Sequence, residues 1–457
     1  MSLDTSKRVH FVGIGGAGMS AIAKVLLERG FEVSGSDLKS SRAITMLEAM
    51  GARVDIGHDE RHVEGAGLVV VSTAIPQSNP ESARAAELGI EVMQRGRALA
   101  ALLEPHRSII VAGTHGKTTT TSMIVTILRA AGVDPTYLIG AGLNDVGTNA
   151  RSGTSDVAVA EADESDGSFL WLRPHVAVVT NVEMDHHDRW NDLQELEEAF
   201  SSFMSSGDEN GTIVVPAEDL GLMTRARAAG RSVTTFGVGG DVAAEEISPG
   251  AEGSSFILVC GDRRHEVELR VPGLHNVSDG LTAAAAAFAV GIPADAIARG
   301  LNAYRGVERR FQLRGKARGV TVIDDYAHHP TEVRATLAAA RVGPWRRVVA
   351  VFQPHRYSRT AALFEDFGAS FQEADRIVLM DVYGAGEEPV PGVTGKLIAD
   401  AACVHLPGRS IAYFPHRSDL LGYLVSSVRP GDALLTLGAG DVTTVGDELL
   451  DRLATAS

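Results

Sequence analysis

The sequence predicts an α/β protein built from three doubly wound modules with mostly parallel sheets. First, short β-branched runs alternate with longer helical segments through almost the whole chain, which is typical of parallel sheets covered by helices. Second, a glycine-rich loop follows a short strand in two separate places. Third, 457 residues correspond to about three domains of ~150 residues each.

Composition narrows the possible partners and the compartment. The chain has 42 Lys and Arg against 58 Asp and Glu, a net charge of −16, so it lacks the basic field that binds nucleic acid or an anionic membrane. Its two cysteines, Cys260 and Cys403, are too few and too far apart for a disulfide framework, which fits a reducing compartment. There is no apolar signal core in the first residues, and the apolar stretch 281–292 is too short to cross a bilayer. We therefore expect a cytoplasmic protein with no membrane insertion and no nucleic-acid partner.

The first module is expected to span residues 1–105. A helix is predicted at 19–29, ending at Gly30, which is typical of a helix C-terminus. The segment Glu104-Pro105-His106 is typical of a linker. The strands of this module are expected at 8–13, 32–36 and 68–72.

The central module is expected to span 106–313 and the final module 314–457. In the central module, the stretch 237–272 is rich in glycine turns and short strands, which predicts a meander at the edge of the sheet. The other central elements are expected to be strands at 108–112, 156–160 and 175–180 and helices from Lys117 and at 276–290. The strands of the final module are expected at 320–324, 347–352, 376–380, 410–414 and 433–437.

The first glycine-rich loop predicts a diphosphate-binding site. It reads Gly13-Ile14-Gly15-Gly16-Ala17-Gly18 between a strand and a helix, where glycines permit close backbone approach and the helix N-terminus offers free amides. Asp37 ends the next strand, at the place where an acid binds the ribose in dinucleotide folds. The motif alone does not separate NAD from another diphosphate such as a UDP-sugar.

The second loop predicts ATP binding. It runs from Ala112 to Thr118 and ends in Gly116-Lys117-Thr118, where backbone amides surround the phosphates, the lysine reaches the terminal ones and the threonine hydroxyl sits on Mg²⁺. Position 111 is valine, so the loop is shorter than the full G-x-x-x-x-G-K-T pattern.

Acidic side chains follow two neighbouring strands of the central module. In a parallel sheet their ends meet at one edge, where oxygen ligands suit Mg²⁺ and a neutral imidazole can join a second metal site. The alternative is a solvated acidic loop. The pair His186-His187 has no thiolate or spaced histidine set beside it that would indicate zinc. The side chains in question are Glu161, Asp163, Glu164 and Asp166 after one strand and Asn181, Glu183, Asp185 and His186 after the next.

The final module places arginines and histidines after its first two strands. The segment 324–330 ends in Pro330, a favoured first residue of a helix, and the segment 353–359 carries Arg356 and Arg359. Guanidinium groups bind carboxylates and phosphates in a bidentate way, so the two segments together, with Arg309 and Arg310, indicate a site for a small acidic substrate. Taken singly, each segment also fits surface arginines that follow a strand.

Seven segments in this order resemble the Mur ligase family over nearly the full chain: GTHGKTTTT, EADESDGSFL, NVEMDHHD, HNVSD, GVERRF, DDYAHHPTEV and QPHRYSRT. The resemblance implies a Rossmann-like first domain that binds a UDP-sugar, a central P-loop-type ATPase domain and a Rossmann-like C-terminal domain that helps to bind ATP and an amino acid. It implies ATP- and Mg²⁺-dependent ligation of L-alanine to the lactoyl carboxylate of UDP-N-acetylmuramate through an acyl phosphate.

The resemblance also implies roles for individual residues. The catalytic residues would be Lys117, Glu161 and His186, and the metal ligands Thr118, Glu161 and His186. The ATP site would comprise Gly113, Thr114, His115, Gly116, Lys117, Thr118, Thr119, Asn276, Arg310 and Asp325. The UDP-sugar site would comprise Gly13, Gly15, Gly16, Ala17, Gly18, Asp37 and Ser72. The amino-acid site would comprise Tyr326, His328, Arg356 and Arg359.

One position departs from the family pattern. The family usually has a second asparagine three residues after the first in H-N-x-x-N, and this chain has Asp279 there. An ionised aspartate accepts hydrogen bonds but donates none, so in that form it does not take the donor role of an amide. The alternatives are a recycling ligase that attaches a preformed peptide to the same UDP-sugar, an oxidoreductase built on the first loop, and a non-catalytic nucleotide-binding regulator.

Overall fold

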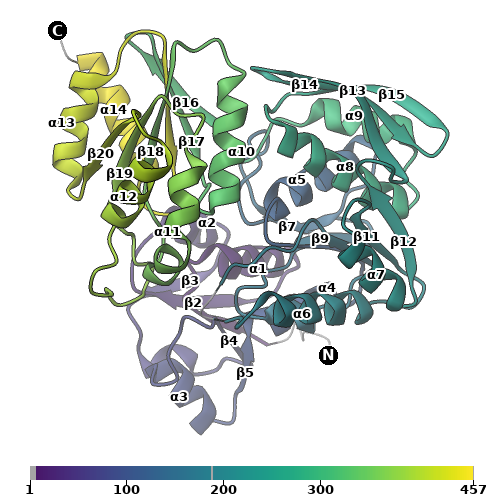
Figure 1. Cartoon of the computed structure of the whole chain (residues 1–457). Helices are drawn as coiled ribbons and strands as arrows, with labels where there is room; N and C mark the ends of the chain where they lie inside the picture. The colour runs from purple at the N-terminus through teal and green to yellow at the C-terminus, as the bar shows by residue number, and fades with distance from the viewer. Residues whose placement is uncertain (1–6, 187–188, 456–457) are drawn as a thin grey trace.

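The computed structural model describes residues 7–186 and 189–455, which form three sheets in sequence order (Figure 1). We call residues 7–103 the first unit, 107–303 the central unit and 312–455 the C-terminal unit. Most neighbouring strands are parallel, and helices lie between most of them in sequence, so the predicted α/β architecture is confirmed.

The first unit is a five-stranded parallel sheet. Its elements are β1 (Val9–Val12), α1 (Ala17–Glu28), β2 (Val33–Asp37), α2 (Arg42–Ala49), β3 (Arg53–Ile56), the 3₁₀ helix η1 (Glu60–Val63), β4 (Leu68–Val71), α3 (Pro80–Glu87), β5 (Glu91–Gln94) and α4 (Arg95–Leu103). The strand order is β3-β2-β1-β4-β5. Consecutive strand residues face opposite sides of a sheet, so Phe11 packs with α1 whereas Val12 packs toward α3.

The central unit is a ten-stranded sheet. Its elements are β6 (Arg107–Ala112), α5 (Lys117–Ala130), β7 (Thr136–Leu138), β8 (Ala150–Arg151), β9 (Val157–Glu161), the 3₁₀ helix η2 (Ser168–Trp171), β10 (Val176–Val179), α6 (Leu193–Ser205), β11 (Thr212–Pro216), α7 (Leu220–Ala228), β12 (Ser232–Phe236), β13 (Val242–Gly250), β14 (Gly253–Cys260), β15 (Arg263–Leu269), α8 (Leu274–Ala289) and α9 (Ala294–Ala303). The strand order is β15-β14-β13-β12-β11-β10-β6-β9-β7-β8.

The expected meander lies at one edge of this central sheet. Strands β13, β14 and β15 are antiparallel neighbours, which confirms the prediction for 237–272. The strands are longer than expected, with 9, 8 and 7 residues. The parallel strands β10, β6 and β9 lie side by side, so the loops that follow them meet at one edge of the sheet.

The C-terminal unit is a six-stranded sheet in the order β16-β17-β21-β18-β19-β20. Strand β16 runs antiparallel to β17, and the other pairs are parallel. Its elements are β16 (Gln312–Ala317), β17 (Val320–Asp325), α10 (Pro330–Arg341), β18 (Arg347–Phe352), α11 (Tyr357–Ser370), β19 (Arg376–Met380), α12 (Gly395–His405), β20 (Ser410–Phe414), α13 (Arg417–Ser427), β21 (Asp432–Leu437) and α14 (Thr443–Thr455).

Strand β16 is not among the strands that the sequence predicts. Its residues, Gln312 to Ala317, include no β-branched side chain, and pairing with β17 is what makes the segment a strand. The expected division between residues 313 and 314 would cut through this strand. We propose that the division between the central and C-terminal units lies instead in the connecting segment 304–311.

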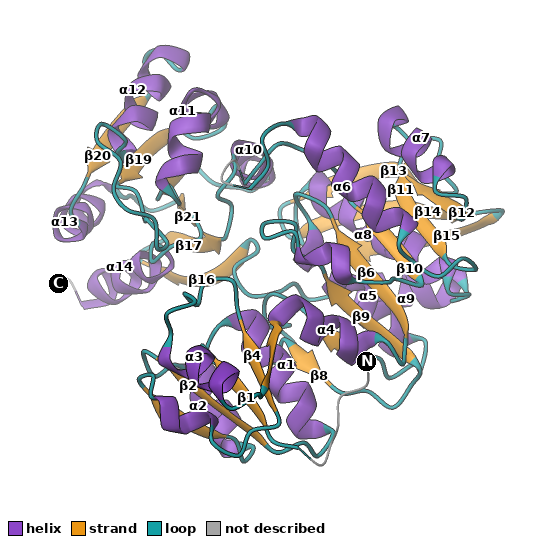
Figure 2. Ribbon diagram, turned by 90° about the horizontal axis from the view of Figure 1, so that it is seen from below, coloured by secondary structure: helices purple, strands orange, loops and turns teal. Residues whose placement is uncertain are grey.

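The buried cores divide the molecule differently from the sheets. One hydrophobic cluster includes Phe11 and Leu103 of the first unit together with Ile110 and Phe200 of the central unit. Helix α1 contacts β7 and β8, and Figure 2 shows α1 and α4 beside the central sheet. The C-terminal unit has two clusters of its own, which contain no residue of the other units. The first two units therefore share a core that the third does not.

Both cysteines are free, Cys260 buried in β14 and Cys403 exposed on α12. The apolar stretch 281–292 belongs mostly to α8, whose residues from Leu281 to Ala287 are all buried. No helix in the described part of the chain combines the length and the apolarity that crossing a membrane requires.

Candidate active site

The first glycine-rich loop, Asp37 and Ser72 lie at the carboxyl edge of the first sheet, because β1 lies between β2 and β4. Gly13 has a φ of +82°, a left-handed conformation that glycine adopts without strain. The amide of Gly15 donates to Asp37 Oδ2 at 2.9 Å, and Gly16 is the N-cap of α1. The residues predicted to bind the UDP-sugar are thus neighbours around one helix N-terminus.

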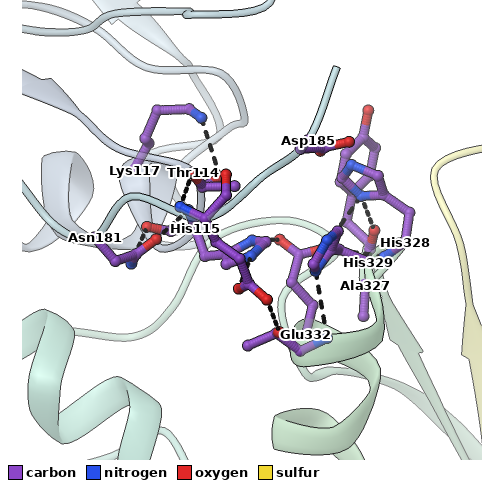
Figure 3. Close-up of polar contacts among 12 residues, drawn as sticks. Thr114, His115, Lys117, Asn181, Asp185, Ala327, His328, His329 and Glu332 are labelled. Carbon is purple, nitrogen blue, oxygen red and sulfur yellow. Dashed lines mark hydrogen bonds and ion pairs between the residues drawn. The ribbon is translucent and has the colours of Figure 1, made fainter. Parts of the chain in front are cut away.

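The second loop lies between β6 and α5 and is fixed to the loop after β10. The His115 amide donates to Asn181 Oδ1 at 2.9 Å, and the Thr114 hydroxyl donates to the Glu183 carbonyl at 3.0 Å (Figure 3). Gly116 is the N-cap of α5 at a φ of +80°. The first amides of a helix have no partner within the helix, so this turn presents them to an anion.

Lys117 is paired with a buried carboxylate in this structure. Its ammonium donates to Glu164 Oε2 at 2.8 Å and to the Gly113 carbonyl at 2.6 Å. Burial raises the pKa of Glu164 to about 7, although the charge of Lys117 opposes that shift. His186 Nε2 lies 3.6 Å from Glu164 Oε1, so Lys117 and His186 meet at one carboxylate.

Two of the three predicted metal ligands carry a buried atom that has no hydrogen-bond partner among the described residues. Thr118 hydrogen-bonds to Glu161, whose pKa burial raises. Among the described residues, Glu161 Oε2 and His186 Nδ1 are buried and have no hydrogen-bond partner. A hard cation suits the oxygens of Thr118 and Glu161, and His186 lies instead with Asp163 and Glu164, which together could hold a second metal ion. His187, the second histidine of the pair, lies outside the described residues.

A cavity of about 330 Å³ opens beside the second loop, between the central and C-terminal units. The predicted ATP residues that line it are His115, Gly116, Thr119, Asn276, Arg310 and Asp325. Asn276 is buried and donates to the Pro272 carbonyl at 2.6 Å. Asp325 accepts the amides of Phe311 and Ala327, so it orders both loops at the C-terminal side of the cavity.

Asp279, the departure from the family pattern, also lines this cavity. Burial raises its pKa to about 7, and the charge of Arg310 opposes that shift. Its carboxyl lies against the second loop, since a Cβ built on Gly116 would come within 2.3 Å of Asp279 Oδ1. The protonated carboxyl can donate a hydrogen bond as well as accept one, as a side-chain amide can.

His115 joins the central unit to the C-terminal unit. Its Nε2 lies 3.0 Å from Glu183 and its Nδ1 lies 3.4 Å from Glu332 of α10. Burial lowers the pKa of His115, but the hydrogen bonds to Glu183 and Glu332 outweigh it and raise the pKa to about 9. At neutral pH a charged imidazole therefore lies between two carboxylates from different units. Arg310 lies 3.6 Å from the same Glu332.

Of the residues predicted for the amino-acid site, Tyr326, His328 and Arg359 lie around His355, whereas Arg356 lies near Glu387. Tyr326 and His328 have ring centroids 5.1 Å apart, and His328 lies 5.9 Å from the ring of His355, which lies near Arg359. Burial lowers the pKa of His328 to about 3, so its imidazole is neutral at pH 7. Arg356, in contrast, lies 3.8 Å from Glu387.

Arg359 binds a carboxylate from the other side of the unit boundary. Its Nε and Nη2 donate to the two oxygens of Asp185 at 2.9 and 3.0 Å, and both side chains are almost fully buried. Arg309 donates to Asp324 at 3.2 Å and to the Gly438 carbonyl at 2.7 Å, so it fixes the connecting segment to the C-terminal unit.

Sequence reasoning missed several residues that complete the site. Glu332 and His355 lie within two of the quoted segments, but nothing in the spacing indicates their contacts with His115 and Arg359. Glu164 and Asp185 are in the acidic cluster that the sequence predicts, but nothing in the sequence indicates that Glu164 contacts Lys117 and Asp185 contacts Arg359.

Family models match three consecutive stretches of the chain. They are described as the Mur ligase family catalytic domain over residues 8–107, the Mur ligase middle domain over 111–287 and the Mur ligase glutamate ligase domain over 309–440. A protein of Rubrobacter xylanophilus named UDP-N-acetylmuramate–L-alanine ligase is 49% identical over 98% of this chain and 100% of its own length. The chain belongs to the Mur ligase family.

Further relatives agree with this membership. A second UDP-N-acetylmuramate–L-alanine ligase, from Renibacterium salmoninarum, is 45% identical over 100% of this Mur ligase and 98% of its own chain. The crystal structure of UDP-N-acetylmuramate-alanine ligase from Thermotoga maritima superposes with a TM-score of 0.83 at 29% identity, covering 99% and 100% of the chains. A murein peptide ligase from Psychrobacter arcticus gives 0.74 at 27% identity, covering 99% of both chains.

Proposed function

We propose that this Mur ligase joins L-alanine to the lactoyl carboxylate of UDP-N-acetylmuramate, using ATP and releasing ADP and phosphate. The proposal is supported above all by what lies at the junction of the central and C-terminal units. There the Lys117 loop, the cavity beside it and the Arg359 group meet across one boundary. Relatives that align over the full chain carry the name UDP-N-acetylmuramate–L-alanine ligase, which identifies the substrates we assign.

The chemistry needs an activated carboxylate, because oxide is a poor leaving group. The lactoyl carboxylate oxygen attacks the γ-phosphorus of ATP, ADP leaves and an acyl phosphate forms. The amine of alanine then attacks the acyl carbon, and the tetrahedral intermediate expels phosphate as the nitrogen loses a proton. Positioning and charge neutralisation dominate such a transfer.

The residues of this chain divide that work. Lys117 is placed at the phosphate loop, where its ammonium would leave Glu164 to meet the incoming phosphates. Thr118 and Glu161 would hold Mg²⁺, which neutralises phosphate charge when bound, and His186 would belong to a second metal site. Asn276, Arg310 and Asp325 would contact the nucleotide in the cavity. A Mur ligase from Thermotoga maritima with the same fold has been solved in complex with ADP.

The remaining roles follow from the two other groups of residues. The loop from Gly13 to Gly18, with Asp37 and Ser72, would bind the diphosphate and ribose of the UDP-sugar at the N-terminus of α1. Arg359, with Tyr326 and His328, would hold the alanine carboxylate and leave the amine free to attack. We place this reaction in the cytoplasm.

A coupled phosphate assay tests the proposal directly. We expect phosphate release from ATP only when UDP-N-acetylmuramate and L-alanine are both present. Release that depends on neither substrate would contradict the proposal. Replacing alanine by a preformed tripeptide in the same assay tests whether the protein is a recycling ligase. Phosphate release with UDP-N-acetylmuramate and the tripeptide, but not with UDP-N-acetylmuramate and alanine, would favour that activity.

Lys117→Ala is expected to abolish ligation while leaving UDP-N-acetylmuramate binding nearly unchanged. The ammonium lies at the phosphate loop of the central unit, whereas the glycine loop belongs to a different sheet. Phosphate release measures the first property, and titration calorimetry with UDP-N-acetylmuramate measures the second. An equal loss of both would show that the two sites are not separate.

A further inference from the structure

The Asp185–Arg359 pair is the most buried ion pair at the junction of the central and C-terminal units. Asp185 follows β10 of the central unit, and Arg359 lies in the first turn of α11 of the C-terminal unit. Their side chains are 6% and 4% exposed. Removing one partner of such a pair leaves an uncompensated buried charge, so each side chain depends on the other for its place.

The pair uses only one edge of the guanidinium. Nε and Nη2 contact Asp185, whereas Nη1 lies 3.3 Å from His355 Nδ1 and 3.4 Å from the His355 carbonyl. A guanidinium carries five N–H groups and can bind a carboxylate at its side edge and another at its end. Among the described residues no carboxylate forms an ion pair with the Nη1 end of Arg359.

Asp185 is also bonded to the residue that follows it. Its Oδ1 accepts the amide of His186 at 2.8 Å, and His186 has a φ of +53°, which is uncommon for a residue with a side chain. One carboxylate therefore fixes both the backbone turn that aims His186 and the guanidinium of Arg359.

We infer that Asp185 is a positioning residue for the incoming amino acid. By holding the Nε edge of Arg359 it directs the Nη1 end toward the group formed by Tyr326, His328 and His355, where the amino-acid carboxylate binds. Because Arg359 is already ordered, the amino acid does not have to immobilise a long flexible side chain. The inference rests on the proposed function, since it takes Arg359 as the group that binds the alanine carboxylate.

The test compares two Arg–Asp pairs of the same kind. Asp432 accepts from Arg347 Nε at 2.9 Å and Nη2 at 2.6 Å and is also buried, but both residues belong to the C-terminal unit, and neither is among the predicted site residues. Asp185→Asn is expected to raise KM for L-alanine at least about tenfold, with KM for ATP and for UDP-N-acetylmuramate within about threefold of the parent values. Asp432→Asn is expected to lower the thermal midpoint and leave all three KM values unchanged.

A double-substitution cycle separates positioning from a merely structural role. If Asp185 acts through Arg359, then the effects of Asp185→Asn and Arg359→Lys on KM for L-alanine are not additive. Asp185→Glu keeps the charge and is expected to raise KM for L-alanine less than Asp185→Asn does. Should Asp185→Asn fail to fold, the selective rise in KM for L-alanine is read from Asp185→Glu.

Several results would overturn the inference. An unchanged KM for L-alanine, or an equal rise in all three KM values, would make Asp185 a structural residue only. A lower KM for L-alanine would mean that Asp185 competes with the substrate for Arg359. If the parent enzyme releases no phosphate in response to L-alanine, the proposed function fails and the inference falls with it, whereas an active parent with an unselective Asp185→Asn variant overturns the inference alone.

Discussion

Buried carboxylates hold several of the cations that the proposed reaction requires. Lys117 contacts Glu164, Arg310 lies near Glu332 and Arg359 binds Asp185. A buried cation without a counter-charge is costly, so the chain supplies an internal anion where phosphate or carboxylate would bind. The substrates would therefore bind to cations that already have an internal carboxylate partner, either by displacing that carboxylate or by binding beside it.

Asp279 gives a prediction about ATP binding and pH. Its carboxyl lines the cavity, and its pKa is raised from 3.8 to about 7 by burial. As pH rises through 7 the carboxyl loses its only donor and gains a negative charge beside the predicted site of a polyanion. We compare KM for ATP of the parent with KM for ATP of Asp279→Asn by dividing the first by the second. This ratio is expected to rise by roughly 2- to 10-fold between pH 6 and pH 8.5, which corresponds to the free energy of about one hydrogen bond. A ratio that stays constant over this range would contradict the prediction.

His115 gives a prediction about stability and pH. The pKa of this imidazole is about 9 in the folded chain against an ordinary value of 6.5, and the groups that face it are Glu183, Glu332, His329 and, through Glu332, Arg310. A raised pKa means that the folded state binds the proton more tightly, so the stabilisation is complete below pH 6.5 and disappears as pH rises to 9. Urea unfolding should therefore show a difference in free energy of unfolding between the parent and His115→Gln that is larger at pH 6 than at pH 10. A difference that does not change with pH would exclude a charged His115.

The two loops that follow β1 and β6 carry the residues that we propose bind the UDP-sugar and ATP, and each has glycine at positions with a positive φ. Gly116 has a φ of +80°, and a Cβ there would come within 2.3 Å of Asp279 Oδ1. Gly132, which follows the other end of the same helix, has a φ of +81° and no atom within 4 Å of a built Cβ. The two glycines therefore share the backbone conformation but differ in their surroundings.

Gly116→Ala and Gly132→Ala are expected to lower stability by a similar amount, about 1–2 kcal/mol, because each forces alanine into the left-handed region. Only Gly116→Ala is expected to weaken ATP binding, since its methyl group would displace Asp279 and distort the turn. Thermal midpoints measure the common effect, and titration calorimetry with ADP measures the specific one. Equal loss of nucleotide affinity in both variants would show that backbone strain alone disrupts the loop.

At the level of elements, the sequence predicts those strands and helix ends that depend on the residues of the segment itself. The β-branched runs locate β6, β10 and β18 within about two residues, and Pro330 is the first residue of α10 as expected. Strand β16 was missed because it depends on a partner strand and not on its own residues. The contacts of Glu332 and Asp185 were missed for the same reason, since each joins segments more than 100 residues apart in sequence.

The whole molecule consists of a larger body and a smaller one. The first and central units share a hydrophobic cluster, whereas the described contacts of the C-terminal unit around the site are mainly polar, such as Asp185 with Arg359 and Glu183 with Thr331. Apolar cores make units unfold cooperatively, and polar interfaces couple them more weakly.

Scanning calorimetry of the full chain is therefore expected to show two transitions, one for the first and central units together and one for the C-terminal unit. UDP-N-acetylmuramate should raise the midpoint of the former and change the latter little, because a ligand stabilises the body that binds it. A single transition, or separate transitions for the first and central units, would contradict this division.

The two cysteines make the relative motion of these bodies directly observable. Cys403 is exposed on α12, whereas Cys260 is buried in β14 and burial raises the pKa of its thiol to about 11. Only the thiolate reacts with maleimide reagents, so a fluorophore will attach to the C-terminal body alone. The sequence thus already contains a single labelling site, and in a variant without Trp345 the energy transfer from Trp171 and Trp190 of the central unit to that label would report a change in the distance between the two bodies.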